Sequence, residues 1–260
     1  MEHSLKIFIL SLIFGVILFI FLVVIHAFFL IGEKGYLLDT LTVLSCIFLS
    51  VSSWLVFKRQ YESHGNLVDS HWFFVSLGFT LWVCAEELWA IRNYLLKFAL
   101  ISDIFWFLGY ILVIYGLYKE TEKVHNFIKA IPEYSLRIRF IKTLPLVVPS
   151  ALVGYSVFVY TIMGFSEYPL YDFVTENIYL TLDAILLYFS LLMMISYYGG
   201  RMTVGLDIFS AGLLLFTVSD SSYILVGGYY PWNPLDILYV VGYTFMGLGL
   251  LVYSRRTVIV

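Results

Sequence analysis

Long apolar runs separated by short polar segments make up most of the chain. Eight runs are long enough to cross the hydrocarbon core of a bilayer, which takes about 20 apolar residues in a helix. The sequence therefore predicts an all-α fold, a polytopic membrane helical bundle of about eight transmembrane helices. The expected spans are residues 5–31, 37–57, 71–93, 102–118, 144–165, 176–198, 205–226 and 234–254. The first run is longer than the core of a signal peptide and lacks a small-x-small cleavage site, so we interpret it as a retained span.

An eight-residue pattern occurs twice, at 103–110 and 236–243. Each copy has an acid, Ile, a bulky apolar residue, an aromatic, two apolar residues, Gly and Tyr. The similarity continues upstream, where the aligned pairs are Gly78 with Gly212, Trp82 with Phe216, Glu86 with Asp220, and Trp89 with Tyr223. We interpret this as an internal duplication into two parallel four-helix repeats, since an even number of spans per repeat keeps the two in the same orientation. The expected units are a first repeat at 1–118, a basic linker at 119–142 and a second repeat at 143–260.

Composition agrees with a membrane protein, because 61% of the residues are hydrophobic and only 13% are charged. The lipid bilayer is thus an expected partner. Of the 15 Lys and Arg residues, 12 fall on the side that holds both termini, so both termini are predicted to be cytoplasmic in a multi-pass protein of the cell membrane. Acids predominate on the other side, which argues against a nucleic-acid partner. The linker 119–142 mixes basic and apolar residues, as an interfacial helix, a docking segment for a partner or a plain solvated linker would.

Acids flanked by aromatic residues recur inside the predicted spans. Trp82, Glu86 and Trp89 share one helix face by their spacing, and Phe216, Asp220 and Tyr223 repeat the arrangement in the other half. A carboxylate at this depth costs on the order of 2 kcal/mol or more unless it is paired, hydrated or protonated. We therefore expect these acids to face the interior of the bundle.

The repeated pattern supplies a second acid in each half. Asp103 shares a face with Trp106, and Asp236 with Tyr239, while the glycines of the pattern leave room for a neighbouring backbone. Short outer turns are expected to bring Glu86 near Asp103 and Asp220 near Asp236, and a weaker pairing of Asp39 with Asp183 fits the same repeat. The candidate ligand-binding residues, in an acidic and aromatic cavity that opens outward, are Glu86, Asp220, Asp103, Asp236, Trp89, Tyr223, Trp106 and Tyr239.

Each of these acids has a structural explanation as well. Asp103 and Asp236 are expected in the first turn of a helix, where a carboxylate caps free amides. Glu86 and Asp220 could form buried pairs that fix helix packing. The first half offers Arg92 and Lys97 as outer cations, but the second half has no outer basic residue. Its acids therefore need a proton, water, a pairing across the pseudo-twofold axis or a bound cation, and aromatic neighbours favour an organic cation over a metal ion.

The sequence lacks the residues that several kinds of chemistry need. There is no HExxH, no paired His for haem, and no Ser, His and Asp set at membrane depth, because His26 is the only His well inside a predicted span. The last two spans carry no Lys for a Schiff base. We expect no enzymatic activity, no cofactor and no metal.

The pattern carried by Asp103, Trp106, Gly109 and Tyr110, and again by Asp236, Tyr239, Gly242 and Tyr243, resembles that of polytopic prokaryotic membrane sensor regions. Such regions precede diguanylate-cyclase, histidine-kinase and PAS domains. The resemblance implies a sensor in signal transduction. Because the chain stops at Val260 without an output domain, a sensor of this kind is expected to signal through a cytoplasmic or membrane partner.

Three functions follow from these observations. The first is a receptor-like sensor for a small, cationic or polar ligand. The second is a small-solute or proton-coupled transporter, since parallel repeats and acids near a pseudo-symmetry axis suit alternating access. The third is a structural or accessory membrane subunit whose acids only hold helices together.

Overall fold

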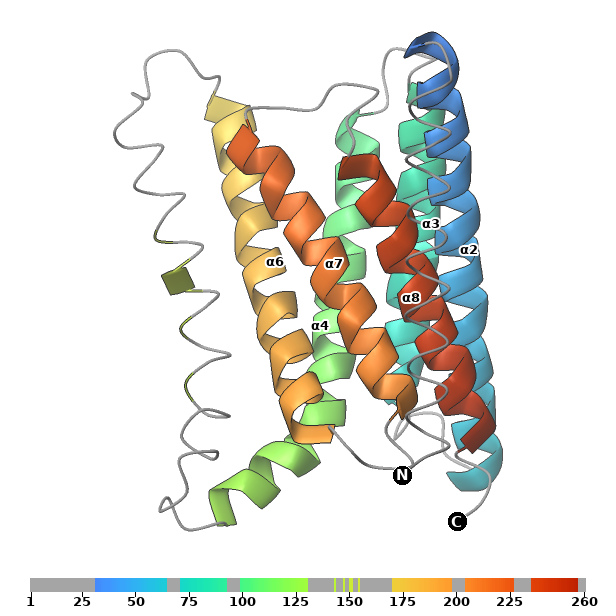
Figure 1. Ribbon diagram of the computed structural model, residues 1–260, viewed down its shortest axis with the longest axis vertical. Helices are drawn as coiled ribbons and strands as arrows, with labels where there is room; N and C mark the ends of the chain where they lie inside the picture. Colours follow the sequence, from blue (N-terminus) through green and yellow to red (C-terminus); the bar gives the residue numbers. More distant parts are fainter. Residues whose placement is uncertain are drawn as a thin grey trace.

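Six long helices form the part of the protein that the computed structural model describes (Figure 1). They are α2 (Ile31–His64), α3 (His71–Arg92), α4 (Ala99–Ala130), α6 (Leu170–Tyr197), α7 (Val204–Val226) and α8 (Leu235–Arg256). Beyond these helices, the described residues are 143, 147, 150, 151 and 154. The first and fifth predicted spans, 5–31 and 144–165, therefore lie almost entirely outside the described residues.

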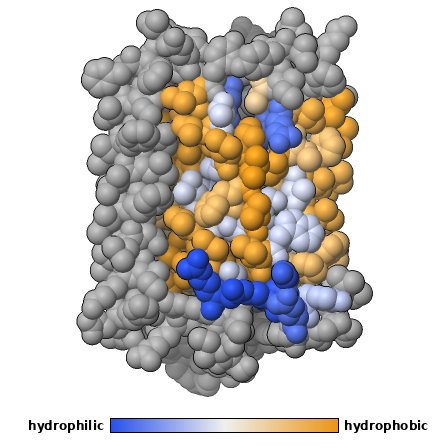
Figure 2. Space-filling view, turned by 90° about the vertical axis from the view of Figure 1, so that its right-hand side faces the viewer, coloured by the Kyte–Doolittle hydropathy of each residue, from blue (hydrophilic) through white to orange (hydrophobic). Residues whose placement is uncertain are grey.

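All six helices are long and apolar enough to cross a membrane. Their membrane-length segments are Leu37–Glu62, His71–Ala90, Ile101–Glu122, Val174–Ile195, Val204–Tyr223 and Leu235–Arg255. This confirms six of the predicted spans to within a few residues. One face of the bundle shows a broad apolar band bordered below by hydrophilic residues (Figure 2), as expected of a multi-pass membrane protein.

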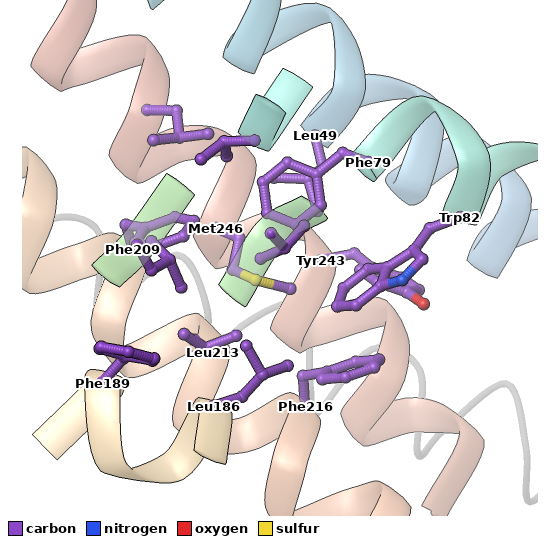
Figure 3. Packing of buried hydrophobic residues seen from close by; sticks show 14 of the residues in the cluster. Leu49, Phe79, Trp82, Leu186, Phe189, Phe209, Leu213, Phe216, Tyr243 and Met246 are labelled. Carbon is purple, nitrogen blue, oxygen red and sulfur yellow. The ribbon is translucent and has the colours of Figure 1, made fainter. Parts of the chain in front are cut away.

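The helices pack as a closed ring. Around it, α2 contacts α3, α3 contacts α4, α4 contacts α6, α6 contacts α7, α7 contacts α8, and α8 returns to α2 (Figure 1). Side chains of α3 and α7 meet in the middle, where Trp82 stacks on Phe216 with 4.8 Å between ring centroids. Figure 3 shows this contact with Tyr243 beside it. Both stacked rings are fully buried, so the centre of the bundle is filled by aromatic side chains.

Glycines set two close helix crossings. A Cβ atom on Gly109 of α4 would lie 2.9 Å from the carbonyl oxygen of Gly78 on α3. On α8, a Cβ atom on Gly242 would lie 3.1 Å from the carbonyl oxygen of Gly212 on α7. At Gly109 only a residue without a side chain permits this approach, and at Gly242 a Cβ atom would force its neighbours to move by a few tenths of an ångström. The expectation that Gly109 and Gly242 make room for a neighbouring backbone is confirmed.

A third close crossing lies further along α7 and α8. A Cβ atom on Gly249 would come within 2.3 Å of the backbone nitrogen of Phe209 and 2.6 Å of the carbonyl oxygen of Gly205. Both obstacles are backbone atoms, which cannot rotate away. The α7–α8 contact is therefore held close over two helical turns, by Gly242 and again by Gly249.

The helix α4 begins earlier and ends later than the predicted span 102–118. It starts at Ala99, so Asp103 is in the second turn, and the first turn of α4 holds no acid. The expectation that Asp103 caps this helix is wrong, because residues 99–101 are apolar helix formers that extend the helix toward its N-terminus. Asp236, by contrast, is in the first turn of α8 as expected. At its other end α4 continues to Ala130, into the predicted linker 119–142.

Basic side chains gather at one end of the bundle, which we call the basic end. It carries Lys58, Arg59, Lys119 and Arg255. Arg59 Nη1 donates a hydrogen bond of 2.5 Å to the carbonyl oxygen of Ser254, which ties α2 to α8. His71 Nε2 lies 2.5 Å from Glu120 Oε2, which ties α3 to α4. We call the opposite end, where α6 and α8 begin, the acid end.

Candidate functional site

Glu86 lies inside the bundle near the acid end. It is six residues before Arg92, the last residue of α3, which places it about 9 Å along the helix axis from that end. Its side chain is 6% exposed. The hydroxyl of Tyr243 on α8 donates a hydrogen bond of 2.7 Å to Glu86 Oε1. The carboxyl groups that interact with it electrostatically are Asp39, Asp236 and Asp220.

Asp220 occupies the corresponding place on α7. It is likewise six residues before the end of its helix, at Val226. Tyr110 on α4 donates a hydrogen bond of 3.0 Å to Asp220 Oδ2. Tyr239 on α8 donates to Asp220 Oδ1. Both oxygens of this carboxylate therefore accept hydrogen bonds from tyrosine hydroxyl groups.

Each of these two acids accepts a hydrogen bond from a tyrosine of the opposite helix pair. Glu86 is on α3, next to α4, but its donor Tyr243 is on α8. Asp220 is on α7, next to α8, but one of its donors, Tyr110, is on α4. The two hydrogen bonds thus connect the α3–α4 pair with the α7–α8 pair on both sides of the central Trp82.

Tyr110 and Tyr243 are absent from the candidate residues that the sequence predicts. Each is the last residue of the repeated eight-residue pattern, so the pattern contained the signal. Both side chains are fully buried. Their rings lie 5.0 and 6.2 Å from the ring of Trp82. A tyrosine hydroxyl at such a position needs a hydrogen-bond partner, and a carboxylate supplies the strongest acceptor.

A further acid, Asp183 on α6, joins the same group. Its side chain is fully buried, and the hydroxyl of Tyr110 lies 2.7 Å from Asp183 Oδ1. Asp183 and Asp220 interact electrostatically. Asp183 Oδ2 is buried and has no hydrogen-bond partner. Tyr110 therefore stands between two carboxyl groups.

The remaining predicted acids are also hydrogen-bonded by tyrosines. Tyr179 on α6 donates a hydrogen bond of 2.8 Å to Asp103 Oδ1. Tyr223 on α7 donates to Asp236 Oδ1, while Asp236 Oδ2 is buried without a partner. The acids that interact electrostatically with Asp236 include Asp39 and Glu86. Asp236 of α8 is therefore a neighbour of acids on α2 and α3.

The aromatic residues of the predicted site contact one another around the central stack. Trp106 lies 5.9 Å from Trp82 between ring centroids. Tyr223 and Tyr239 stack at 5.7 Å. Trp89 is partly buried on α3. The predicted aromatic residues thus lie on the helices that carry the acids, and three of them contact another member of the set or the central Trp82.

The positive side chains that the structure describes belong to the basic end. The ion pairs that join described residues are all at the basic end, namely Lys58 with Glu62, His71 with Glu120, and Lys119 with Glu122. Glu86, Asp183 and Asp220 take part in none of them. The side chains of Arg92 and Lys97, the outer cations expected from the sequence, lie outside the described residues.

The chemistry of the site follows from its donors and acceptors. Within the described helices, no group of three or more His, Cys, Asp or Glu side chains is arranged to hold a metal ion. The groups present are carboxyl oxygens, tyrosine hydroxyls and aromatic rings, which suit a proton or an organic cation. Comparisons with protein-family models, curated proteins and solved structures find no match for this chain.

Proposed function

We propose that the protein is an integral membrane receptor that binds a small cationic or polar ligand at the acid end and signals through a partner. One observation carries the proposal. Glu86 and Asp220 are each hydrogen-bonded by a tyrosine of the opposite helix pair, with no described cation to balance their charge. A ligand that competes for these carboxylates therefore acts on the bonds that join the two helix pairs.

The proposed mechanism is a competition between the ligand and the tyrosines. An ammonium group donates stronger hydrogen bonds to a carboxylate than a neutral phenol does, because both partners are then charged. The rings of Trp82 and Phe216 add cation–π attraction. As Tyr243 loses its bond to Glu86 and Tyr110 its bond to Asp220, α3–α4 are released to shift against α7–α8. The ligand favours the shifted arrangement to the extent that it binds this arrangement more tightly than the ligand-free one.

We also infer that the two helix pairs are the cores of duplicated four-helix repeats within a bundle of eight spans. Aligned glycines form matching crossings, Gly78 with Gly109 and Gly212 with Gly242. Trp82 stacks on its aligned residue Phe216, as residues on a pseudo-twofold axis do. The ring order also fits, because α2 contacts α3 and α8 while α6 contacts α7 and α4.

The remaining parts of the proposal concern orientation and output. The positive-inside rule supports a basic end that faces the cytoplasm, where Arg59 and Arg255 lie. The likeness to polytopic prokaryotic sensor regions supports a signalling role with a partner at that end. A shift between helix pairs would reach this partner through the contacts that join α2 to α8 and α3 to α4 at the basic end.

The receptor proposal is tested by ligand-induced thermal stabilisation. Purified protein is screened against a panel of primary, secondary and quaternary amines, and compounds that raise the unfolding temperature are retested on variants. Glu86→Gln and Asp220→Asn each keep the side-chain shape but lose the charge, and we expect both to abolish the stabilisation. Glu87→Gln is the matched control, because Glu87 is the next residue of α3 and its side chain is exposed.

The outcomes of this screen distinguish a receptor from a structural subunit. An amine that stabilises wild type and Glu87→Gln but neither site variant supports the receptor. If no compound stabilises the wild type, or if the site variants respond like wild type, the receptor proposal fails. A purely structural role predicts lower unfolding temperatures for Glu86→Gln and Asp220→Asn together with no response to any amine.

A polar contact in the middle of α2 and α3 favours a second candidate, a small-solute or proton-coupled carrier. Ser50 Oγ and Thr80 Oγ1 lie 3.1 Å apart, and Trp54 Nε1 donates a hydrogen bond of 3.0 Å to the same Thr80 Oγ1. These groups lie between Glu86 and the basic end, where a carrier needs polar lining. A carrier predicts solute uptake by proteoliposomes that is lost in Glu86→Gln, and uptake that survives this change would contradict it.

A further inference from the structure

The hydroxyl of Tyr110 has two carboxyl neighbours but only one proton to donate. Its oxygen lies 2.7 Å from Asp183 Oδ1 and 3.0 Å from Asp220 Oδ2. A phenol supplies one O–H donor and can accept with its lone pairs. If both carboxyl groups were ionised, one of these two contacts would place two acceptors against each other. A proton on one carboxyl group removes the conflict, because that group then donates to the phenol oxygen.

The described residues around Asp183 supply no positive charge. The titratable side chains that face Asp183 are Tyr110 from α4, Asp220 from α7 and Tyr239 from α8, while Tyr179 precedes it by one turn on α6. None of them is a cation. Two like charges at hydrogen-bonding separation from one phenol repel each other, and the repulsion is stronger where the groups are buried. A single proton would relieve both the donor shortage and the repulsion.

The two carboxyl groups differ in the donors available to them. Asp220 accepts from Tyr239 at Oδ1 as well as from Tyr110 at Oδ2. Among the described residues Asp183 has one tyrosine donor, Tyr110, and its side chain also pairs with that of Asp220, a pairing that needs a proton on one of the two acids. Its Oδ2 atom is buried with no described donor. A buried oxygen without a donor is less costly on a neutral carboxyl group than on a carboxylate. The donors therefore favour Asp220 as the anion and Asp183 as the neutral acid.

We propose that Asp183 is a resident proton-binding site. Its Oδ1 atom carries the proton and donates to the Tyr110 oxygen, and Tyr110 donates in turn to Asp220 Oδ2. Asp183 is 0% exposed, so a proton fits where a larger cation would have to displace packed side chains. This goes beyond the proposed receptor function, because the ligand-free protein holds the proton, and it leaves Asp220 as the acid whose charge a ligand can neutralise.

The test compares two asparagine variants by infrared spectroscopy, without any ligand. The wild type at neutral pH should show a carboxylic-acid C=O stretching component that shifts in D2O. Asp183→Asn should lose this component, whereas Asp220→Asn should retain it. A component that is unchanged in Asp183→Asn, or that is lost only in Asp220→Asn, would overturn the proposal.

Thermal unfolding of the same variants gives a second readout. An asparagine amide has the shape of a neutral carboxyl group and can donate to Tyr110 as the protonated acid does, so Asp183→Asn should unfold near the wild-type temperature. Asp220→Asn should unfold at a lower temperature, because its amide group would face hydroxyls that already donate. The reverse order, or an Asp183→Asn variant that does not fold, contradicts a neutral Asp183. The receptor proposal depends on amine binding, so either idea can fail without the other.

Discussion

Replacing Gly249 by alanine should destabilise the protein more than any other single methyl group added at a described helix position. The new Cβ atom would meet the backbone nitrogen of Phe209 at 2.3 Å and the carbonyl oxygen of Gly205 at 2.6 Å. Neither atom can move without pushing α7 and α8 apart. Overpacking of this kind costs up to about 3 kcal/mol, which a reversible denaturant titration in mixed micelles would measure as a lower free energy of unfolding.

Gly154→Ala is the matched control for this change. Gly154 is helical, and a Cβ atom built on it meets no described residue within 4 Å. In open space a Gly→Ala change in a helix is neutral or favourable by up to about 1 kcal/mol. If both variants had the same free energy of unfolding, α7 and α8 would not cross as closely as described.

Tyr243→Phe should have the second large effect, because it removes the hydroxyl that donates to Glu86 at 2.7 Å. A hydrogen bond contributes about 0.5–1.5 kcal/mol between neutral groups and about 1.5–3 kcal/mol when one group is charged. We expect a loss of this size in the free energy of unfolding. Tyr115→Phe is the control, since Tyr115 is 45% exposed on α4 and its hydroxyl should add little.

A double-mutant cycle separates this bond from general packing. Glu86→Gln is made alone and together with Tyr243→Phe. If the two side chains interact as described, the double variant should lose at least about 1 kcal/mol less than the sum of the single losses. Additive losses would show that the hydroxyl and the carboxyl group act independently.

The sequence was sufficient to predict six of the spans, because hydrophobic length is a local property. The segment expected at 71–93 is observed at His71–Ala90, and that expected at 205–226 is observed at Val204–Tyr223. The close approach at Gly109 and Gly242 was also predictable from the pattern. The first residue of α4 was not predictable, because the sequence before Asp103 has no strong helix-stop or capping signal.

The hydrogen-bond partners of the acids depend on tertiary packing and could not be predicted. Glu86 and Tyr243 are 157 residues apart, and Tyr110 and Asp220 are 110 apart. A helix pattern identifies the residues that share a face but not the neighbouring helix that meets this face. The sequence alignment of the two halves pairs Glu86 with Asp220. It does not indicate that each acid accepts a hydrogen bond from a tyrosine of the other half.

The separation between Glu86 and Tyr243 also bears on how the chain folds during synthesis. Tyr243 follows Glu86 by 157 residues, so most of the chain between them has still to be made when α3 and α4 enter the bilayer. The first helices are therefore in the membrane before the final hydrogen-bond donor of Glu86 exists, and an unpaired carboxyl group at this depth is costly. Glu86 should accordingly be a residue at which the nascent chain depends on water, lipid headgroups or an insertion chaperone until α8 arrives.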